Sequence, residues 1–332
     1  MVKSVNEAFK LFMKNNINLD AEKVKQARES RDNLLMNLQE FDNEDFFHLC
    51  QNYNVHFGSF SRKTKCSPLD DIDLMIGLTA DGATYNQFES WDNITIIASS
   101  LNDSQQNSIN SDGTLNSTLV LNKFKKKLEK VREYQNSDLK RNGEAVVLNL
   151  ISKDWSFDIV PCFHTVVENN GRAYDIIPNG NGKWKKTDPI IEQDRISKVN
   201  TKHNGRVLDT IRLVKYWNRR GKMPTIISYV LETMIVDYFE SITDTPQLIE
   251  QRFRDVLYYI KDHIWTNIYD SKGIEGNINE LDYFEKSKIQ TRAFNDYNKT
   301  LNAISAELTD KDQEKAINIW GDIFGEEFPK YE

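Results

Sequence analysis

Hydrophobic residues recur at helical spacing along the first forty residues of the chain. Phe9 and Phe12 lie on one side of a first short helix. The run 21–41 carries an apolar stripe along a longer, highly charged helix, and Asp20 is suited to cap its start. Such a helix needs a partner surface for its stripe. We therefore expect residues 1–50 to form N-terminal helices that brace the two lobes that follow.

The hydrophobic period changes after these helices. The run 72–76 is apolar and has strand character, and the runs 145–151 and 156–162 are typical of the two strands of a hairpin. We therefore expect a mixed α/β core over residues 51–185.

Two segments inside this core differ from its strands. Residues 99–117 are rich in Ser, Asn, Asp and Gln without periodicity, which indicates a mobile loop or an insertion. Residues 119–134 follow as a basic helix, and its lysines either contact nucleic acid or form a solvated helix face.

Turn residues separate this core from a long helical region. The cluster 179–182 and the Asp188-Pro189 pair break the pattern, and the remaining sequence is helical in its periodicity. The helices are expected over residues 206–220, 225–241, 246–265, 279–308 and 312–324. We therefore expect an α+β protein with two lobes, whose C-terminal lobe covers residues 186–332 and is helical.

Composition narrows the class of protein. The chain has 332 residues, of which 39% are hydrophobic, so it can form a sizeable core and is not disordered as a whole. Its formal charge of −7 disfavours a protein that binds nucleic acid constitutively through phosphates. No apolar run is long enough for a membrane span, and the first residues lack the apolar core of a signal peptide. Three scattered cysteines fit a reducing compartment, so we expect a cytoplasmic protein without membrane association.

The charge is distributed unevenly along the chain. Residues 182–222 contain 12 Lys and Arg against 4 Asp and Glu, a local charge of +8. Residues 232–332 contain 11 against 21, a local charge of −10. A basic segment in an acidic protein suits a concave site for a small polyanion, and a solvated helix face explains the same charge equally well.

Two carboxylates share one face of an apolar strand. Asp71 and Asp73 are two residues apart, so both side chains lie on the same side, while Ile72 and Leu74 face the core. Neighbouring carboxylates repel each other, and a divalent cation removes that cost. Oxygen ligands without His or Cys indicate Mg²⁺, for which Mn²⁺ can substitute.

Residues on either side of this pair extend the candidate site. Gly58 allows the backbone to approach a ligand closely, and Ser59 offers a hydroxyl and an amide to phosphate oxygens. Asp158 is an acid inside a second apolar strand, a costly position that a shared metal site explains. Cys66 lies close by in sequence, and we expect it to lack a basic partner that would make it a nucleophile.

At this point the sequence resembles a known family. Gly58-Ser59, Asp71-x-Asp73 and Asp158 match the polymerase-β-like nucleotidyltransferases. More narrowly, the chain is similar to the bacterial cyclic GMP-AMP synthase/DncV-like nucleotidyltransferases. The segments that carry this similarity are Gly-Ser-Phe-Ser-Arg-Lys-Thr (58–64), Pro-Leu-Asp-Asp-Ile-Asp (68–73), Asp-Ile-Val-Pro (158–161), Trp184-x-x-Thr187-Asp188-Pro189, Lys-Tyr-Trp (215–217) and Ser-Tyr-Val-Leu-Glu (228–232).

The resemblance implies a bilobed nucleotidyltransferase core and a role for each matching residue. Asp71, Asp73 and Asp158 would be the catalytic ligands of two Mg²⁺ ions. The residues that would contact the nucleotide are Gly58, Ser59, Arg62, Thr64, Lys215, Ser228 and Tyr229. Among these, Lys215 and Ser228 would face the cleft and hold the outer phosphates. Tyr229 would stack on a nucleobase, although its apolar neighbours suit a core residue equally well.

The resemblance also implies a reaction. The chain would be a template-independent nucleotidyltransferase that makes a cyclic di- or trinucleotide second messenger from NTPs in bacterial anti-phage (CBASS) signalling. Its partners would be NTPs such as ATP, GTP or pyrimidine NTPs, with a regulatory protein or an effector reached through the product. The alternatives are an RNA 3′-end nucleotidyltransferase, a protein-modifying nucleotidyltransferase and a catalytically silent nucleotide-binding module.

Overall fold

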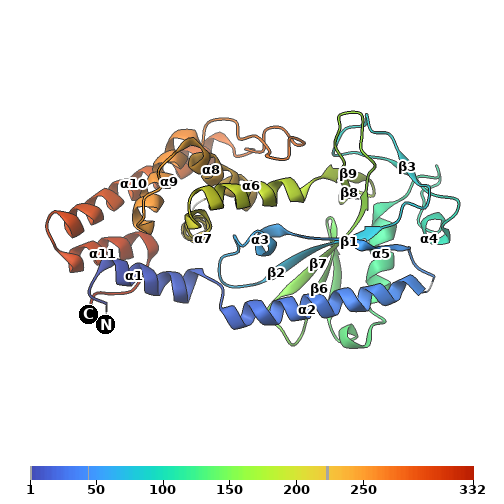
Figure 1. Cartoon of the computed structure of the whole chain (residues 1–332), viewed down its shortest axis with the longest axis horizontal. Coiled ribbons are helices and arrows are strands. Elements are labelled where there is room, and N and C mark those ends of the chain that lie inside the picture. Colours follow the sequence, from blue (N-terminus) through green and yellow to red (C-terminus); the bar gives the residue numbers. More distant parts are fainter. Residues whose placement is uncertain (1, 44, 222–223) are drawn as a thin grey trace. The chain divides into compact units, whose positions relative to one another are not determined.

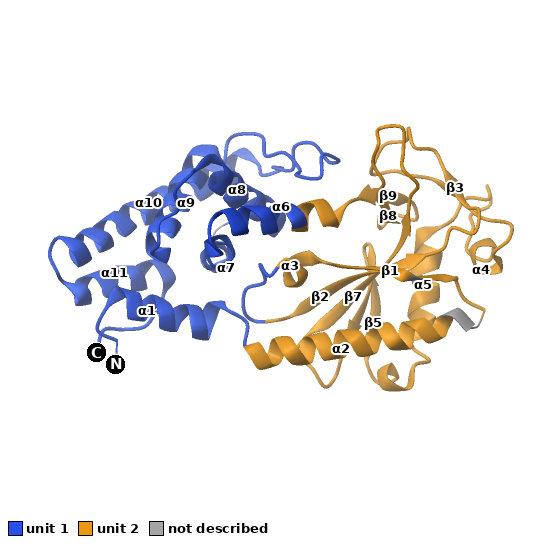
Figure 2. Cartoon of the chain, viewed as in Figure 1, with its two compact units in different colours: residues 1–20, 63–68, 194–332 blue, residues 21–62, 69–193 orange. Residues whose placement is uncertain are grey.

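The computed structural model describes residues 2–43, 45–221 and 224–332 (Figure 1), and these form two compact units that alternate along the chain. Unit 1 contains residues 1–20, 63–68 and 194–332, and unit 2 contains residues 21–62 and 69–193 (Figure 2). These units differ from the expected boundaries at residues 50 and 185. The first twenty residues belong with the C-terminal helices, whereas the long second helix belongs with the sheet.

Unit 2 is built on a mixed sheet. Along its main path the strand order in the described residues is β1-β2-β7-β6-β5, and β8 pairs with both β7 and β9. The strands of this sheet are β1 (Leu49–Phe57), β2 (Asp71–Leu78), β5 (Asp138–Asn142), β6 (Ala145–Asn149), β7 (Ser156–His164), β8 (Asp175–Pro178) and β9 (Trp184–Thr187). β2 and β7 are parallel, and the other neighbouring pairs are antiparallel. The expected β6–β7 hairpin is therefore confirmed.

The centre of this sheet is apolar because β2 and β7 have neighbours on both sides. Both strands alternate half-buried and buried residues at their start and are buried further along. Met75 of β2 and Val160 of β7 pair in register and pack in one cluster with Val55 of β1. The acidic residues of both strands thus gather at the end where the strands begin, whereas β7 ends with the exposed His164.

The helices of unit 2 include α2 (Ala21–Gln39) and α5 (Ser117–Leu128). Ala27, Leu34 and Leu38 of α2 are buried, which confirms the apolar stripe expected there. α5 ends earlier than residue 134, and a short 3₁₀ turn, Arg132–Tyr134, follows it.

The polar segment 99–117 is not an open loop. It contains the short helix α4 (Asp103–Gln106) and lies beyond the small two-stranded sheet of β3 (Thr84–Tyr85) and β4 (Ile96–Ile97). The buried side chain of Gln105 accepts a hydrogen bond from the Ser99 amide at 2.8 Å. Of the two alternatives expected here, the mobile loop is therefore wrong, because the polar side chains satisfy one another and the local backbone, and the insertion stays a prediction.

Unit 1 is helical apart from its connecting segments. It contains α1 (Val5–Phe12), which continues as a π-helical turn over Met13–Ile17. The C-terminal helices are α7 (Arg206–Arg219), α8 (Ser228–Ser241), α9 (Ile249–His263), α10 (Tyr283–Leu308) and α11 (Gln313–Phe324). α6 (Pro189–Lys202) begins in unit 2 and continues into unit 1. These helices confirm the helical C-terminal region expected from the sequence.

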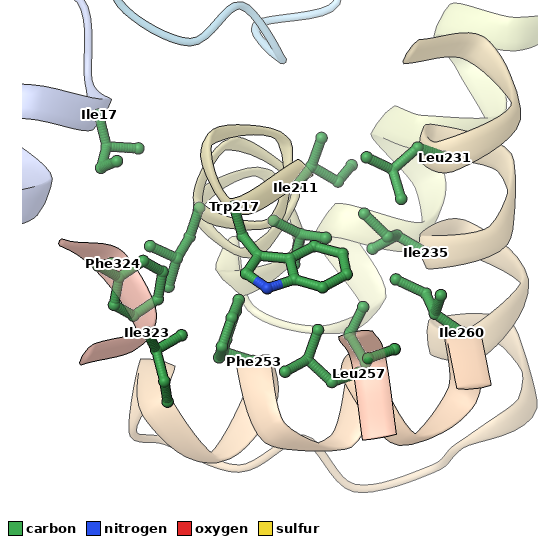
Figure 3. Close-up of a cluster of buried hydrophobic side chains, with 14 of the residues drawn as sticks. Ile17, Ile211, Trp217, Leu231, Ile235, Phe253, Leu257, Ile260, Ile323 and Phe324 are labelled. Atoms are coloured by element: carbon green, nitrogen blue, oxygen red, sulfur yellow. The ribbon is translucent and has the colours of Figure 1, made fainter. Parts of the chain in front are cut away.

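One hydrophobic core joins the helices of unit 1. Figure 3 shows Trp217 of α7 among Ile211, Phe253 and Leu257, all of them fully or almost fully buried. The indole nitrogen of Trp217 donates a hydrogen bond to Asp296 of α10 at 2.8 Å, so the polar atom of this buried ring is satisfied. None of the helices in the described ranges has the length and apolar composition to cross a bilayer.

Candidate active site

The three predicted carboxylates lie on the two central strands of unit 2. Asp71 and Asp73 are on β2 and Asp158 is on β7, and all three are half-buried among buried neighbours. Asp73 and Asp158 are register partners in the parallel pair, and Asp71 is paired with Ser156. Register partners on neighbouring strands lie about 4.8 Å apart and project to the same face of the sheet. The structure therefore places the three acids on one face, with Asp73 and Asp158 side by side.

The Gly-Ser turn lies against this pair. Gly58 and Ser59 form the start of α3 (Gly58–Ser61), the short turn that follows β1. Gly58 has a φ of +72°, and a Cβ added there would overlap the carboxylate of Asp73. The hydroxyl of Ser61 donates to the carbonyl oxygen of His56 at 2.9 Å, which holds the turn on β1. Gly58 is therefore needed both for the left-handed backbone and for the close approach to Asp73.

The donor set suits an oxygen-preferring cation, although the side chains do not form a finished metal site. Three carboxylates without His or Cys are the ligands that Mg²⁺ and Mn²⁺ prefer. Across the described residues, however, no group of three or more His, Cys, Asp or Glu side chains is arranged to hold a metal ion. The chemistry of Asp71, Asp73 and Asp158 thus fits the expected metal, and their joint coordination stays a prediction.

Arg62, the residue after α3, lies beside an acid of its own unit. Its Nη1 atom is 3.2 Å from a carboxylate oxygen of Glu192, and both side chains are about nine-tenths buried. This ion pair fixes the end of the Gly-Ser turn to α6. A contact between Arg62 and phosphate stays a prediction.

Thr64 and Lys215 are both buried and share one carboxylate partner. Thr64 is 0% exposed, and its hydroxyl donates to Glu232 at 3.0 Å. Lys215 is 2% exposed, and its ammonium group donates to the other carboxylate oxygen of Glu232 at 2.6 Å. A buried carboxylate partner thus holds Lys215 in the interior of unit 1, and its expected place facing the cleft stays a prediction. Nucleotide contacts of Thr64 and Lys215 stay predictions that require this cluster to open.

Ser228 and Tyr229 begin α8. Ser228 is exposed at the first residue of the helix, where backbone amides favour an anion. Tyr229 is half-buried against the helical core, its hydroxyl donates to Asp270, and the ammonium group of Lys272 lies 4.2 Å from its ring centre. Of the two expected roles of Tyr229, the structure shows its contact with the core. Its stacking on a base stays a prediction.

Part of the positive charge of the basic segment 182–222 is paired with acids. Several of its cations lie in ion pairs within their own unit: Lys185 with Glu144, Lys186 with Glu168, Arg195 with Asp237 and Glu240, Arg212 with Asp209, and Lys215 with Glu232. Apart from Asp209, which lies three residues before Arg212, these acids come from outside the segment and neutralise part of its charge.

The carboxylates do not line the large cavity of unit 1. That cavity has a volume of about 760 Å³, and its walls include Ser67, Tyr216 and Arg219 but none of the predicted site residues. Nearby, Cys66 is fully buried, and burial raises the pKa of its thiol in spite of neighbouring cations such as Arg219. Burial therefore disfavours the nucleophilic thiolate of Cys66, whereas the expected lack of basic partners is wrong, because Arg219, Lys215 and Lys65 lie near the thiol.

Comparison with known proteins identifies the family. A curated protein of Bacillus cereus strain VD146, named "Probable cyclic nucleotide synthase", is 40% identical to this chain over 335 residues, with 100% of each chain covered. The chain belongs to the bacterial DncV-like nucleotidyltransferases. The model of the Second Messenger Oligonucleotide or Dinucleotide Synthetase domain matches residues 103–200.

Solved structures share the fold of this DncV-like nucleotidyltransferase. The DncV cyclic AMP-GMP synthase of Vibrio cholerae matches with a TM-score of 0.71 at 10% identity, over 99% of this chain and 98% of that one. CdnC of Escherichia coli MS115-1, in its complex with HORMA-deltaN, matches with a TM-score of 0.70 at 16% identity, over 98% of both chains. The α+β nucleotidyltransferase fold expected from the sequence is confirmed, and the chain is a nucleotidyltransferase of this family.

One residue of this DncV-like enzyme was missed by the sequence analysis. Glu232 appeared there only as the end of a matching segment, yet its carboxylate binds both Thr64 and Lys215. It is an acid in the apolar stretch 230–236, and the argument that singled out Asp158 in its apolar strand applies to it equally.

Proposed function

We propose that this enzyme joins NTPs into a cyclic di- or trinucleotide. The observation that carries the proposal is the pairing of Asp73 with Asp158 on neighbouring parallel strands, with Gly58 against the Asp73 carboxylate. The 40% identity to a named cyclic nucleotide synthase supports the class of product.

The residues of unit 2 supply the binding groups for this reaction. Asp71, Asp73 and Asp158 would hold two divalent cations, Mg²⁺ or Mn²⁺, and Ser59 would bind the donor triphosphate through its hydroxyl and amide. When bound, such cations lower the pKa of the attacking hydroxyl and neutralise charge on the leaving group.

The reaction is an exchange of bonds at phosphorus. A ribose hydroxyl oxygen attacks the α-phosphorus of an NTP, the bond to the β-phosphate breaks, and pyrophosphate leaves while the hydroxyl proton passes to solvent. Positioning and charge neutralisation therefore do most of the work, and the side chains transfer few protons. In the proposal Ser228 contributes to binding the outer phosphates and Tyr229 to binding a base, whereas a phosphate contact of Lys215 requires its bond to Glu232 to open.

Product analysis tests the proposal. The purified protein is incubated with all four NTPs and Mg²⁺, treated with phosphatase, and the resistant product is identified by mass spectrometry. We expect a small cyclic species. Asp71→Ala and Asp73→Ala are each expected to abolish it while circular dichroism stays unchanged, with the exposed neighbour Asp70→Ala as the control that keeps activity. Turnover retained by either site variant would contradict the assignment.

The alternatives give different products in the same assay. Extension that requires added RNA would indicate an RNA 3′-end nucleotidyltransferase, and nucleotide attached to a protein would indicate a protein-modifying enzyme. No product from any NTP would indicate a silent nucleotide-binding module.

We further propose that the product is a second messenger in anti-phage (CBASS) defence. The complex of the structural relative CdnC with HORMA-deltaN supports a regulatory protein partner for this enzyme. Bacteria that carry the wild-type gene with its neighbouring genes should survive phage infection better than bacteria that carry Asp73→Ala. Equal survival of the two strains would refute this biological role without touching the enzymatic one.

A further inference from the structure

A six-residue segment connects the candidate site to the helical unit. Residues 63–68, here called the strap, belong to unit 1, whereas the residues on both sides of them belong to unit 2. The strap starts one residue after the end of α3, with Arg62 between them, and two residues separate its end from Asp71, the first residue of β2. The chain therefore leaves the site after the Gly-Ser turn, enters the helical unit and returns at the strand that carries two of the carboxylates.

Backbone contacts fasten both ends of the strap within unit 1. The carbonyl oxygen of Lys63 accepts a hydrogen bond from Nη1 of Arg212 at 2.6 Å. The amide of Ser67 donates to the carbonyl oxygen of Ile17 at 2.9 Å. Between these ends, Cys66 is fully buried in the hydrophobic core of the helical unit. A segment held at both ends and in its middle has little freedom of its own.

The polar anchor of the strap is Thr64. Its hydroxyl donates to Glu232 of α8, and the second oxygen of that carboxylate binds Lys215 of α7. Glu232 is only 1% exposed, so its charge depends on these partners. The cluster thus ties one strap residue to two helices at once.

A buried ion pair of this kind is a poor source of stability but a good source of fixed geometry. Removing two charges from water costs about as much as their attraction returns, so an apolar pair of the same volume is often as stable. The directional bonds of Glu232 instead define where Thr64 sits. Because the strap is only six residues long, the position of Thr64 limits where the chain can enter and leave the candidate site.

We propose that Thr64, held by Glu232, is a positioning residue of the nucleotidyl transfer reaction. It acts through the strap on the ends of α3 and β2 and does not itself touch substrate. The expected effect of Thr64 on the reaction rate rests on the proposed function. The positioning role replaces the phosphate contact that the resemblance implied for Thr64.

The test compares two threonines of the same unit. Thr64→Val removes only the anchoring hydroxyl, whereas removal of Glu232 would leave Lys215 buried without its partner and endanger folding. The matched control is Thr300→Val on α10, because Thr300 is also 0% exposed and its hydroxyl likewise donates one hydrogen bond, to the carbonyl oxygen of Tyr297 at 2.6 Å. Thr64→Ser restores the hydroxyl and serves as the rescue.

Steady-state kinetics with Mg²⁺ and NTP give the first readout. We expect Thr64→Val to lower kcat between about tenfold and a hundredfold, the range for a small displacement of reacting groups, with KM for NTP changed less than about twofold. Thr300→Val should keep the wild-type kcat, and Thr64→Ser should recover most of it. A rise in KM with unchanged kcat would instead indicate a direct phosphate contact and overturn the proposal.

Hydrogen exchange gives a second readout that needs no activity. Thr64→Val should speed amide exchange in residues 58–62 and 69–73, and Thr300→Val should not. Equal amide exchange of residues 58–62 and 69–73 in the two variants would refute the positioning role of Thr64. If the wild type itself shows no turnover, the proposed function fails, and the exchange comparison still decides the role of Thr64.

Discussion

At the scale of single residues, the close approach of Gly58 to Asp73 is the tightest geometric condition of the candidate site. Gly58 adopts a φ of +72°, and the space that a Cβ would occupy is taken by the Asp73 carboxylate. Gly171 has a similar φ of +79°, but an added Cβ there would meet nothing within 4 Å. A substitution at Gly171 therefore introduces backbone strain alone, whereas a substitution at Gly58 introduces the same strain and a steric overlap with Asp73.

Gly58→Ala is expected to destroy activity, whereas Gly171→Ala is not. Both variants force an L-residue into left-handed backbone, which costs about 1–2 kcal/mol of folding free energy. Gly58→Ala must also displace Asp73 from its place beside Asp158, so nucleotidyl transfer should fall by at least about a hundredfold. Activity assays and urea denaturation of the two variants check this. Near-normal turnover in Gly58→Ala would show that the contact is unimportant for the reaction.

The residues that could be predicted from sequence are those whose chemistry follows from strand alternation. Asp71 and Asp73 share a face because they are two residues apart, and Asp158 is marked by its apolar strand. The environment of Lys215 was not predictable in this way, because its partner is on another helix and Thr64 comes from a segment 151 residues earlier. Sequence periodicity reports which face of an element is buried but does not report which buried polar groups meet.

At the scale of elements, hydrogen bonds of polar side chains organise the segments for which the hydrophobic pattern predicts neither a helix nor a strand. The connection between α9 and α10 is folded around Asp270, whose carboxylate accepts backbone amides of Lys272, Ile274 and Glu275 at 3.0–3.1 Å. The Tyr229 hydroxyl donates to the same carboxylate. As in segment 99–117, such bonds follow no helical or strand period, so they have no signal in hydrophobic patterning.

These bonds give Asp270 a pH-dependent effect on stability. Burial alone would raise the pKa of this carboxyl, but the hydrogen bonds from Tyr229 and the backbone, with the Lys272 charge, hold the pKa below its ordinary value. A lowered folded-state pKa stabilises the protein above the unfolded pKa of about 4 and ceases to do so as the pH falls through the folded value.

Asp270→Asn should therefore destabilise the protein at pH 7 and lose that effect in acid. We expect a cost of about 1–3 kcal/mol at pH 7, because several donors lose a charged acceptor. The difference from wild type should shrink below about pH 4 in urea denaturation measured across a pH series. Asp262→Asn is the control, since Asp262 pairs with Lys261 at the surface, and it should change stability by less than about 1 kcal/mol. A difference that stays constant with pH would contradict the linkage.

At the scale of the whole molecule, the two ends of the chain share one unit. The amide of Glu332 donates to the carbonyl oxygen of Val2 at 3.0 Å. Phe9 of α1 packs against Trp320 of α11 and against Phe328, with ring centres 4.9 and 5.1 Å apart. The first helix is thus part of the C-terminal core, which its distance in sequence concealed.

Phe9→Ala should destabilise unit 1 although it changes only the first helix. Loss of a buried aromatic ring costs about 3–5 kcal/mol, and its apolar neighbours come from the opposite end of the chain. Leu11→Ala on the same helix is the control, because Leu11 is 40% exposed and should change stability by about 0.5 kcal/mol or less. Limited proteolysis should then show early cuts within residues 194–332 of the Phe9 variant. Early cuts confined to the first twenty residues would contradict a shared core.

The alternation of the two units along the chain also limits how the gene can change by recombination. The chain crosses from one unit to the other after residues 20, 62, 68 and 193, so neither unit is encoded by one uninterrupted stretch of gene. A single recombination event cannot bring in a new helical unit while keeping the carboxylate strands. Lineages of this enzyme should consequently diversify by substitution and by insertion into loops, with both units inherited together.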